Sequence, residues 1–207
     1  DSTGDDSSPG DDTAPANNND QIAGDWRLAP EAGALGVGWA RGETGWWSNS
    51  ADDVQTRYCL FDDVYSFNSD DSFANAMGDL TWLEGWQGAA EGCGTPVAPH
   101  DGSNAATYSY DAAAGTLTVV GEGAHIGLAK VTNQGEDGVA TDNTIVYLIS
   151  DLTDTSMTVD INYGGGDNHW RFKLVTADSV AAPVAPVPPS TVSVTFQVNM
   201  DGVDTSN

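Results

Sequence analysis

The chain has 207 residues, of which 31 are acidic and only six are basic, so its formal net charge is −25. A field of this sign repels the phosphates of nucleic acids and of anionic lipids, which argues against both as partners. The length suffices for one domain of roughly 150 residues with a sizeable core. The charge suits a neutral ligand, a cation or a salty environment, while solubility alone also explains many of the acidic side chains.

Residues 1–21 are rich in Asp, Ser, Gly, Pro and Asn and contain almost nothing to bury. We therefore expect a disordered acidic spacer. Asp11 and Asp12 in this spacer are weak candidates for Ca²⁺ ligands, because no EF-hand spacing is present. No apolar run approaches transmembrane length, so we expect no insertion into a membrane. Because the chain starts abruptly at Asp1, we expect a mature fragment whose signal sequence is gone.

The central part of the chain is predicted to form short strands, because it contains short runs rich in β-forming residues. Turn sequences at 111–115 and 151–156 join consecutive strands, which indicates a meander of hairpins. The segment 30–45 is too rich in glycine for a helix and predicts a long irregular loop. The expected strands are residues 22–29, 106–110, 116–120, 145–149, 157–163 and 170–175.

A further hairpin is expected between residues 58 and 77, with turn chemistry at 68–72. Side chains two apart in a strand share a face. The face that this pattern turns toward the core consists of Cys59, Phe61, Tyr65 and Phe67, and the alternation resumes with Phe73, Asn75 and Met77.

Strict alternation places Asp63 inward in this hairpin and Asp62 outward. A buried carboxylate needs a hydrogen bond, an ion pair or a metal ion. Our first interpretation is a structural pairing with Arg57 or Arg171. A β-bulge that turns Asp63 outward and a Ca²⁺ site are the alternatives.

The two cysteines, Cys59 and Cys93, lie on either side of the hairpin and predict a disulfide. Such a bond closes a loop of about 35 residues and stabilises the fold by roughly 3 to 4 kcal/mol. A disulfide also indicates an oxidising location outside the cytoplasm. No CxxC motif is present, so a redox or zinc role is disfavoured.

Seven tryptophans are a high count for this length, and several lie in segments expected to be irregular. Trp46 and Trp47 are neighbours, so an extended backbone turns them to opposite sides and one should be exposed. Trp82 and Trp86 are four residues apart, which stacks them on one face of a short helix, although nearby glycines favour a loop.

These indoles form a candidate sugar site, because pyranose rings pack an apolar face on indole while carboxylates and amides bind hydroxyl groups. The alternative is that most of the indoles fill a core poor in Leu and Ile. The candidate ligand-binding residues are Trp46, Trp47, Trp82, Trp86, Asp62, Glu84 and Gln87.

The C-terminal part changes character. Residues 177–190 predict a semi-rigid linker of the polyproline type. Residues 191–207 open a new alternating strand, which we interpret as the start of a truncated second β module. The alternative is a strand donated to a neighbouring subunit, which would give self-assembly through the C-terminal strand.

Several long motifs stand between residues 22 and 175: GDWRLAPEAGALGVG, GWWSNS, CLFDDVYSFNSDDSF, GDLTWLEGWQG, CGTPVAPHDGS, ATYSYDAAAGTLTVVGEGAHIGL and HWRFKLV. Together they resemble an ancillary domain of secreted proteins from polysaccharide-degrading bacteria. That domain often lies beside family 16 glycoside hydrolase modules of the laminarinase type. GDWRL, DDVYSF and WRFKL also look like bacterial lipocalin-like domains, which implies an up-and-down barrel, with a sandwich or jelly roll as the alternative.

The resemblance implies a non-catalytic carbohydrate-binding module, outside the cell or on the surface of a bacterium, with a β-glucan such as laminarin as partner. The first alternative is a structural subunit of an extracellular fibre or surface layer. The second is a glycoside hydrolase, which is disfavoured because Asp62 and Asp63 point to opposite faces and no E-x-D-x-E run is present. We expect no cofactor beyond a possible structural Ca²⁺. The scattered His100, His125 and His169 are expected at the surface or in loops.

Overall fold

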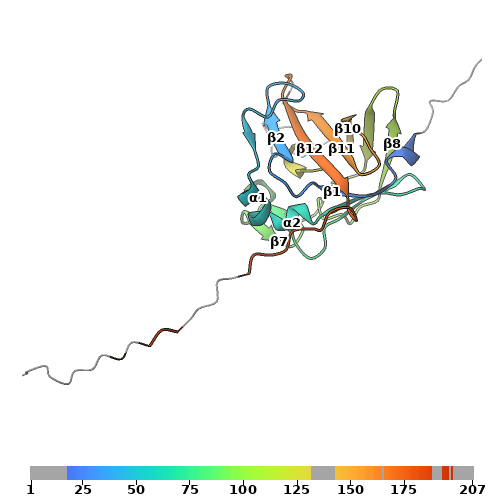
Figure 1. Cartoon of the computed structure of the whole chain (residues 1–207). Helices are drawn as coiled ribbons and strands as arrows, with labels where there is room; N and C mark the ends of the chain where they lie inside the picture. Colours follow the sequence, from blue (N-terminus) through green and yellow to red (C-terminus); the bar gives the residue numbers. More distant parts are fainter. Residues whose placement is uncertain (1–17, 132–142, 165, 188–192, 196, 198–207) are drawn as a thin grey trace, which may run out of the picture.

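A computed structural model describes residues 18–131, 143–164, 166–187, 193–195 and 197 (Figure 1). Asp11, Asp12 and most of the expected acidic spacer lie outside the described residues, and so does most of the segment 191–207. The expected domain boundaries, linker and second module therefore stay predictions.

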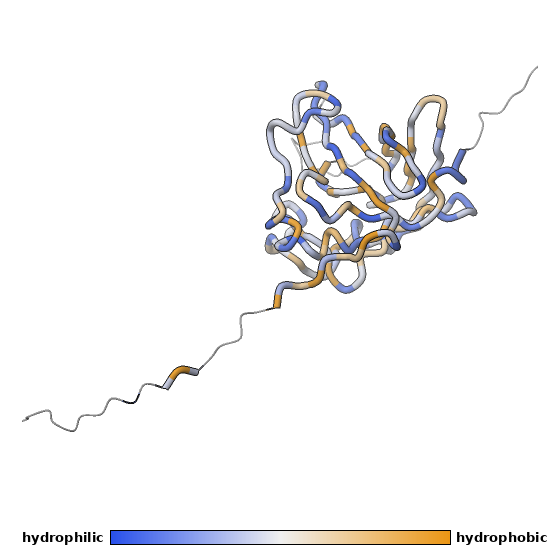
Figure 2. Tube along the Cα trace, viewed as in Figure 1, coloured by the Kyte–Doolittle hydropathy of each residue, from blue (hydrophilic) through white to orange (hydrophobic). Residues whose placement is uncertain are grey.

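Eight antiparallel strands form a closed β-barrel in up-and-down order, which confirms the expected fold. The barrel closes because β1 pairs with β4 on one side and with β12 on the other. Inward residues alternate with exposed ones, most regularly along β8 and β10, and hydrophobic positions recur along the strands (Figure 2). The eight strands are β1 (Gly24–Leu28), β4 (Val64–Phe67), β5 (Ser72–Ala76), β8 (Ala106–Asp111), β9 (Thr116–Val120), β10 (Thr144–Ser150), β11 (Ser156–Asn162) and β12 (His169–Thr176).

The glycine-rich segment after β1 is not the irregular loop that the sequence predicts. It contains β2 (Leu35–Gly38), which pairs with the first half of β12 and with the short β3 (Trp47–Ser48). Leu35 and Val37 are buried. Gly36 and Gly38 alternate with them, and a side chain at either position would overlap Thr44 or Glu43. Glycine is used here because the β2–β3 loop packs directly on the backbone of β2.

The hairpin of β4 and β5 is confirmed, but the residues before it are helical. α1 (Ala51–Thr56) begins at Ser50, whose side chain accepts a hydrogen bond from the backbone of Asp53 while Asp53 accepts one from the backbone of Ser50. This reciprocal cap starts the helix. α2 (Tyr58–Phe61) follows and buries Cys59 and Phe61, so both residues reach the core from a helix and not from a strand.

The Cys59–Cys93 disulfide is confirmed and joins α2 to β7 (Gly92–Gly94). β7 pairs with β6 (Thr81–Leu83) in a small separate sheet, and η2 (Gly85–Gln87) lies between the two strands. Trp82 therefore lies on β6 and Trp86 on η2, so the two do not share one short helix, which was one of the two alternatives that the sequence left open. In Figure 1, α1, α2 and β7 gather on one side of the barrel.

The residues that follow β9 pack into the hydrophobic core of the barrel. We call residues 121–128 the plug, and η3 (Ala129–Val131) follows it. Ala124, Ile126 and Leu128 are buried in the same core as the strands. The backbone N–H of Ile126 donates to the hydroxyl of Tyr147 at 2.9 Å, and that of Gly127 donates to the hydroxyl of Tyr65 at 3.0 Å. The barrel interior is therefore filled by its own chain.

η1 (Asn19–Gln21) precedes the first strand. The side chain of Asn19 is buried, donates a hydrogen bond to the carboxylate of Asp71 and accepts one from the backbone of β8. None of the described helices is long and apolar enough to cross a membrane. No helix or strand is present after Thr176 among the described residues.

Gly127 tests the packing of the plug. Its φ is +76° and a Cβ atom would overlap the ring of Phe172, whereas Gly33 has a similar φ of +74° and open space around it. We expect Gly33→Ala to lower the free energy of unfolding by about 1 kcal/mol through backbone strain alone. Gly127→Ala should lower it by about 1 to 3 kcal/mol more, because the core is overpacked as well. Equal midpoints of urea unfolding for the two variants would contradict the packed plug.

Candidate functional site

A surface cleft of about 440 Å³ lies where the end of the plug meets the β2–β3 hairpin, the β6–β7 connection and β12. Its lining combines indole rings, two cations and two carboxylates. The lining residues are Val37, Trp47, Arg57, Glu84, Glu91, Leu128, Lys130 and Trp170.

Two indoles form part of the cleft wall. The ring centroids of Trp47 and Trp170 are 6.0 Å apart and their planes are tilted by 58°. Trp170 is buried and Trp47 is half-buried. The buried indole N–H groups of Trp170 and of the adjacent Trp82 have no hydrogen-bond partner among the described residues. The cleft is therefore bordered by apolar ring surface.

Arg57, which follows α1, lies over two of these rings. Its guanidinium carbon is 5.5 Å from the ring centroid of Trp47 and 4.5 Å from that of Trp82. Cation–π attraction of this kind orients the guanidinium and stabilises the two indoles. The carboxylate of Asp53, one helical turn earlier, accepts hydrogen bonds from Ser50, and this bonding lowers its pKa.

Lys130 and Glu84 connect the plug end to the β6–β7 connection. Lys130 Nζ lies 3.3 Å from Glu84 Oε1 and 5.0 Å from the ring centroid of Trp170. The second carboxylate oxygen of Glu84 accepts a hydrogen bond of 3.1 Å from the indole N–H of Trp86. Gln87 Oε1 accepts one of 3.0 Å from the backbone N–H of Glu84. The residues around the rings are thus held in fixed positions.

The structure brings together five of the seven residues that the sequence singles out. Trp47 and Glu84 line the cleft itself. Trp82, Glu84, Trp86 and Gln87 line a small adjoining cavity of about 20 Å³. Trp46 is 53% exposed, as expected for one of the two neighbours, but it is not among the residues that line either cavity. Asp62 is exposed and is absent from both linings as well.

Sequence reasoning missed four residues of interest. Arg57 and Lys130 were not considered as ligand contacts, and Trp170 was read only as a core residue. Trp39 at the end of β2 is 52% exposed, and its ring lies against Gly45. No sequence signal singled out Trp39, because the close contact between its ring and Gly45 exists only in the folded chain.

Asp63 is buried, as predicted, but no arginine pairs with it. Its Oδ2 accepts a hydrogen bond of 2.7 Å from the hydroxyl of Thr81, and its Oδ1 is buried with no partner among the described residues. Burial therefore raises the pKa of Asp63 well above its usual range. The described residues contain no group of three or more His, Cys, Asp or Glu side chains that would hold a metal ion.

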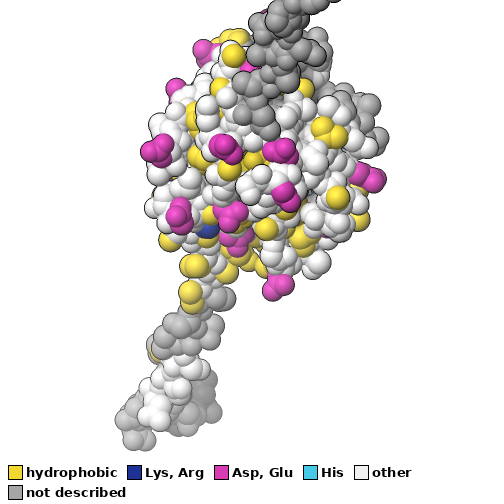
Figure 3. Space-filling view, turned by 90° about the vertical axis from the view of Figure 1, so that its right-hand side faces the viewer, with side chains coloured by type: hydrophobic (Ala, Val, Ile, Leu, Met, Phe, Trp, Pro, Cys, Tyr) yellow, Lys and Arg dark blue, Asp and Glu magenta, His cyan; other side chains and the backbone are white. Residues whose placement is uncertain are grey.

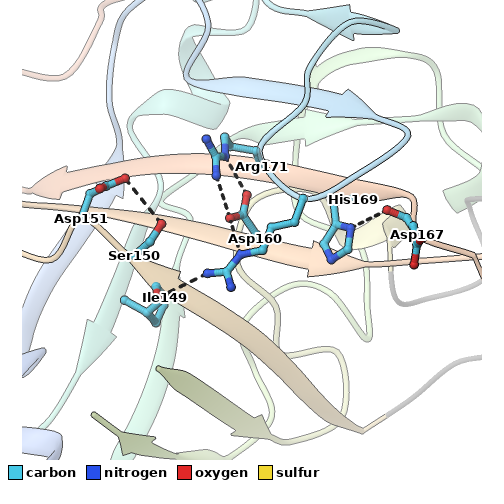
Figure 4. Close-up of polar contacts among 8 residues, drawn as sticks. Ile149, Ser150, Asp151, Asp160, Asp167, His169 and Arg171 are labelled. Atoms are coloured by element: carbon cyan, nitrogen blue, oxygen red, sulfur yellow. Dashed lines mark hydrogen bonds and ion pairs between the residues drawn. The ribbon is translucent and has the colours of Figure 1, made fainter. Parts of the chain in front are cut away.

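Arg171, the other expected partner of Asp63, pairs with Asp160 (Figure 4). Its Nε and Nη2 bind the two carboxylate oxygens at 2.7 and 2.9 Å, and Arg41 Nε adds a contact of 3.1 Å from the β2–β3 loop. Asp160 is fully buried. This network anchors the loop on the outer face of β11 and β12, and so positions the β2–β3 hairpin that carries Trp47.

The three histidines are buried, which corrects the expectation of surface positions, although His100 and His125 do lie in loops. His125 Nδ1 lies 2.9 Å from the carbonyl oxygen of Gly123 within the plug. Burial lowers the pKa of His125 to about 4. The ring of His100 contacts that of Trp86 edge-on at 5.3 Å. His169 Nδ1 lies 2.6 Å from the carbonyl oxygen of Asp167 (Figure 4).

Figure 3 shows carboxylate side chains spread over the face of the molecule that lies on the right-hand side in Figure 1, with basic side chains confined to one small area. The lining of the cleft is of mixed charge, because it holds Arg57 and Lys130 as well as Glu84 and Glu91.

Comparisons with known proteins assign no family. No protein-family model matches the chain, and no curated protein matches it significantly.

The buried carboxyl group of Asp63 predicts a pH dependence of stability. The pKa of Asp63 is raised in the folded state. The contribution of its protonated form to stability is therefore fully present below about pH 4 and is lost as the pH rises through the folded-state pKa. Asp63→Asn keeps an acceptor for Thr81 and cannot ionise. In that window, the free energy of unfolding of the natural protein should fall relative to that of Asp63→Asn by about 1.4 kcal/mol per pH unit.

The measurement is urea unfolding between pH 4 and pH 8. Asp154→Asn, in the exposed turn between β10 and β11, is the matched control for the loss of one charge. A difference between Asp63→Asn and the natural protein that stays constant with pH would show that Asp63 ionises freely in the fold.

Proposed function

We propose that this domain is a non-catalytic carbohydrate-binding module and that the cleft beside Trp47 is its sugar-binding site. The observation that carries the proposal is the cleft of about 440 Å³, in which indole surface is combined with fixed polar side chains. The plug fills the barrel core, so a lipocalin-type ligand cavity inside the barrel is not the favoured site.

The chemistry of the cleft suits a pyranose ring. The half-buried indole of Trp47 offers a face for the apolar C–H side of a sugar, and Trp170 and Leu128 extend that apolar wall. The carboxylate of Glu84 accepts hydrogen bonds from hydroxyl groups, while Lys130 donates them. A few fixed polar groups around an aromatic surface are the usual arrangement of a small-molecule site.

We further propose a β-glucan such as laminarin as the ligand. The resemblance to domains found beside family 16 glycoside hydrolases supports this class, and a net charge of −25 favours a neutral polysaccharide over a polyanion. The resemblance also supports a location outside the cell. The disulfide fits an oxidising compartment.

A binding role is preferred to hydrolysis because Glu84, the carboxylate of the cleft nearest to the indoles of the β6–β7 connection, is already bonded to Lys130 and Trp86. Release of reducing sugar from laminarin by the purified domain, abolished by Glu84→Gln or by Glu91→Gln, would replace the binding role by a hydrolase. The role as a fibre subunit depends on residues 191–207, most of which lie outside the described residues.

Trp47 tests the proposed site directly. We expect Trp47→Ala to weaken binding to laminarin by about tenfold or more, because the stacking surface is lost. Trp46→Ala removes an equally large but more exposed ring next to it, outside the cleft, and should bind as the natural protein does. Affinity electrophoresis in gels with laminarin, mixed-linkage glucan or an unrelated polysaccharide measures the effect.

Thermal melting of both variants separates lost binding from lost folding, since Trp47 also packs against the core. Equal mobility of the natural protein in all gels would remove the proposed function. Retardation that is lost in Trp46→Ala and kept in Trp47→Ala would move the site to the exposed side of the β2–β3 hairpin.

A further inference from the structure

We propose that Arg57 forms a carboxylate-binding subsite in the cleft, so that the preferred glycan is a largely neutral chain that carries uronic acid units. This inference rests on the proposed carbohydrate-binding function and names the substrate class more closely.

The position of Arg57 leaves its hydrogen-bonding edges for a ligand. The guanidinium carbon lies over the rings of Trp47 and Trp82, 5.5 and 4.5 Å from their centroids. The guanidinium N–H groups form no hydrogen bond or ion pair with the described residues. Because Arg57 also lines the cleft, a ligand that enters the cleft meets a guanidinium already held in place.

The acidic groups around Arg57 form no ion pair with it, although Asp53 lies close enough for the charge of Arg57 to help lower its pKa. Asp53 is bonded to Ser50 at the start of α1, with contacts of 2.7 and 2.8 Å. Glu84 is bonded to Lys130 and Trp86. Glu91 lines the same cleft without forming an ion pair with Arg57. In a chain with 31 acidic residues, a guanidinium in a cleft without an ion pair among the described residues is a feature that a ligand carboxylate explains.

A carboxylate fits this position better than other anions. It is planar and matches the two parallel N–H donors of an arginine fork. It carries a single charge, whereas a phosphate monoester or a densely charged polymer meets strong repulsion from a protein with a net charge of −25. On a sugar, the carboxylate of a uronic acid is attached to a ring that can stack on Trp47 at the same time.

The test is an NMR titration of the full chain with methyl β-D-glucuronide and with methyl β-D-glucoside at low ionic strength. The two ligands differ only at C6, which is a carboxylate in the first and a hydroxymethyl group in the second. We expect the glucuronide to bind about tenfold more tightly or better, because charge-assisted bidentate hydrogen bonds are strong. Arg57→Lys keeps the charge and loses the fork, and it should bring the ratio of the two affinities close to one.

Lys130→Gln is the matched control, because it removes the other cation of the cleft and should leave the preference for the glucuronide in place. Equal affinities of the natural protein for the two glycosides, with laminarin still bound, would overturn the carboxylate subsite and leave the proposed function standing. A preference lost equally in Lys130→Gln would show a general charge effect and overturn the role of Arg57. Failure to bind either glycoside or laminarin would overturn both proposals.

Discussion

Two tyrosine hydroxyl groups inside the barrel hold the arrangement on which the rest of the molecule depends. Tyr65 and Tyr147 accept hydrogen bonds from consecutive backbone N–H groups of the plug, at Gly127 and Ile126. Both tyrosines are at most 1% exposed, and burial raises the pKa of each, so both hydroxyls stay protonated. A loop inside a hydrophobic core is tolerable only if its backbone groups find partners, and the tyrosines supply them.

The plug determines where a ligand can bind. Because residues 121–128 pack against Phe172 and the other core side chains, the barrel has no need of a ligand to fill its interior. After Leu128 the chain continues into Lys130, which contacts Glu84 and the ring of Trp170, and Val131 is again part of the core. The cleft therefore lies where a buried loop reaches the surface between the β2–β3 and β6–β7 hairpins. Both hairpins are fixed to the rest of the fold. Asp160 and its two arginines hold the β2–β3 loop, and the Cys59–Cys93 disulfide holds β7.

The barrel was predictable from the sequence because alternation of apolar and polar residues is a local signal. The strands of the meander and the β4–β5 hairpin all follow it, and so does the burial of Tyr65 and Asp63. The errors lie where another local rule competes. A capping box of Ser50 and Asp53 starts a helix just before the region that was read as a strand. Gly36 and Gly38 were taken as loop residues, although their alternation with Leu35 and Val37 has the period of a strand.

The site was predictable only in part, because residue type points to chemistry while partners depend on the tertiary fold. Four of the candidate residues between positions 82 and 87 line a small cavity and Trp47 lines the cleft, while ligand binding by these residues stays a prediction. Arg57 carried no sequence signal, since its role depends on two tryptophans that reach it from β3 and β6. Asp63 was expected to pair with an arginine, yet the nearest available partner in the fold is the hydroxyl of Thr81.

The central claim is that sugar binds in the outer cleft of a filled barrel. It is tested most directly by following the seven indole N–H signals of a ¹⁵N-labelled sample during titration with laminarin oligosaccharides. The account predicts that the signals of Trp47, Trp82 and Trp170 shift, while that of Trp26, which is buried and bonded to the carbonyl oxygen of Ile22, does not. Shifts confined to Trp26, or to Trp39 and Trp46, would contradict it.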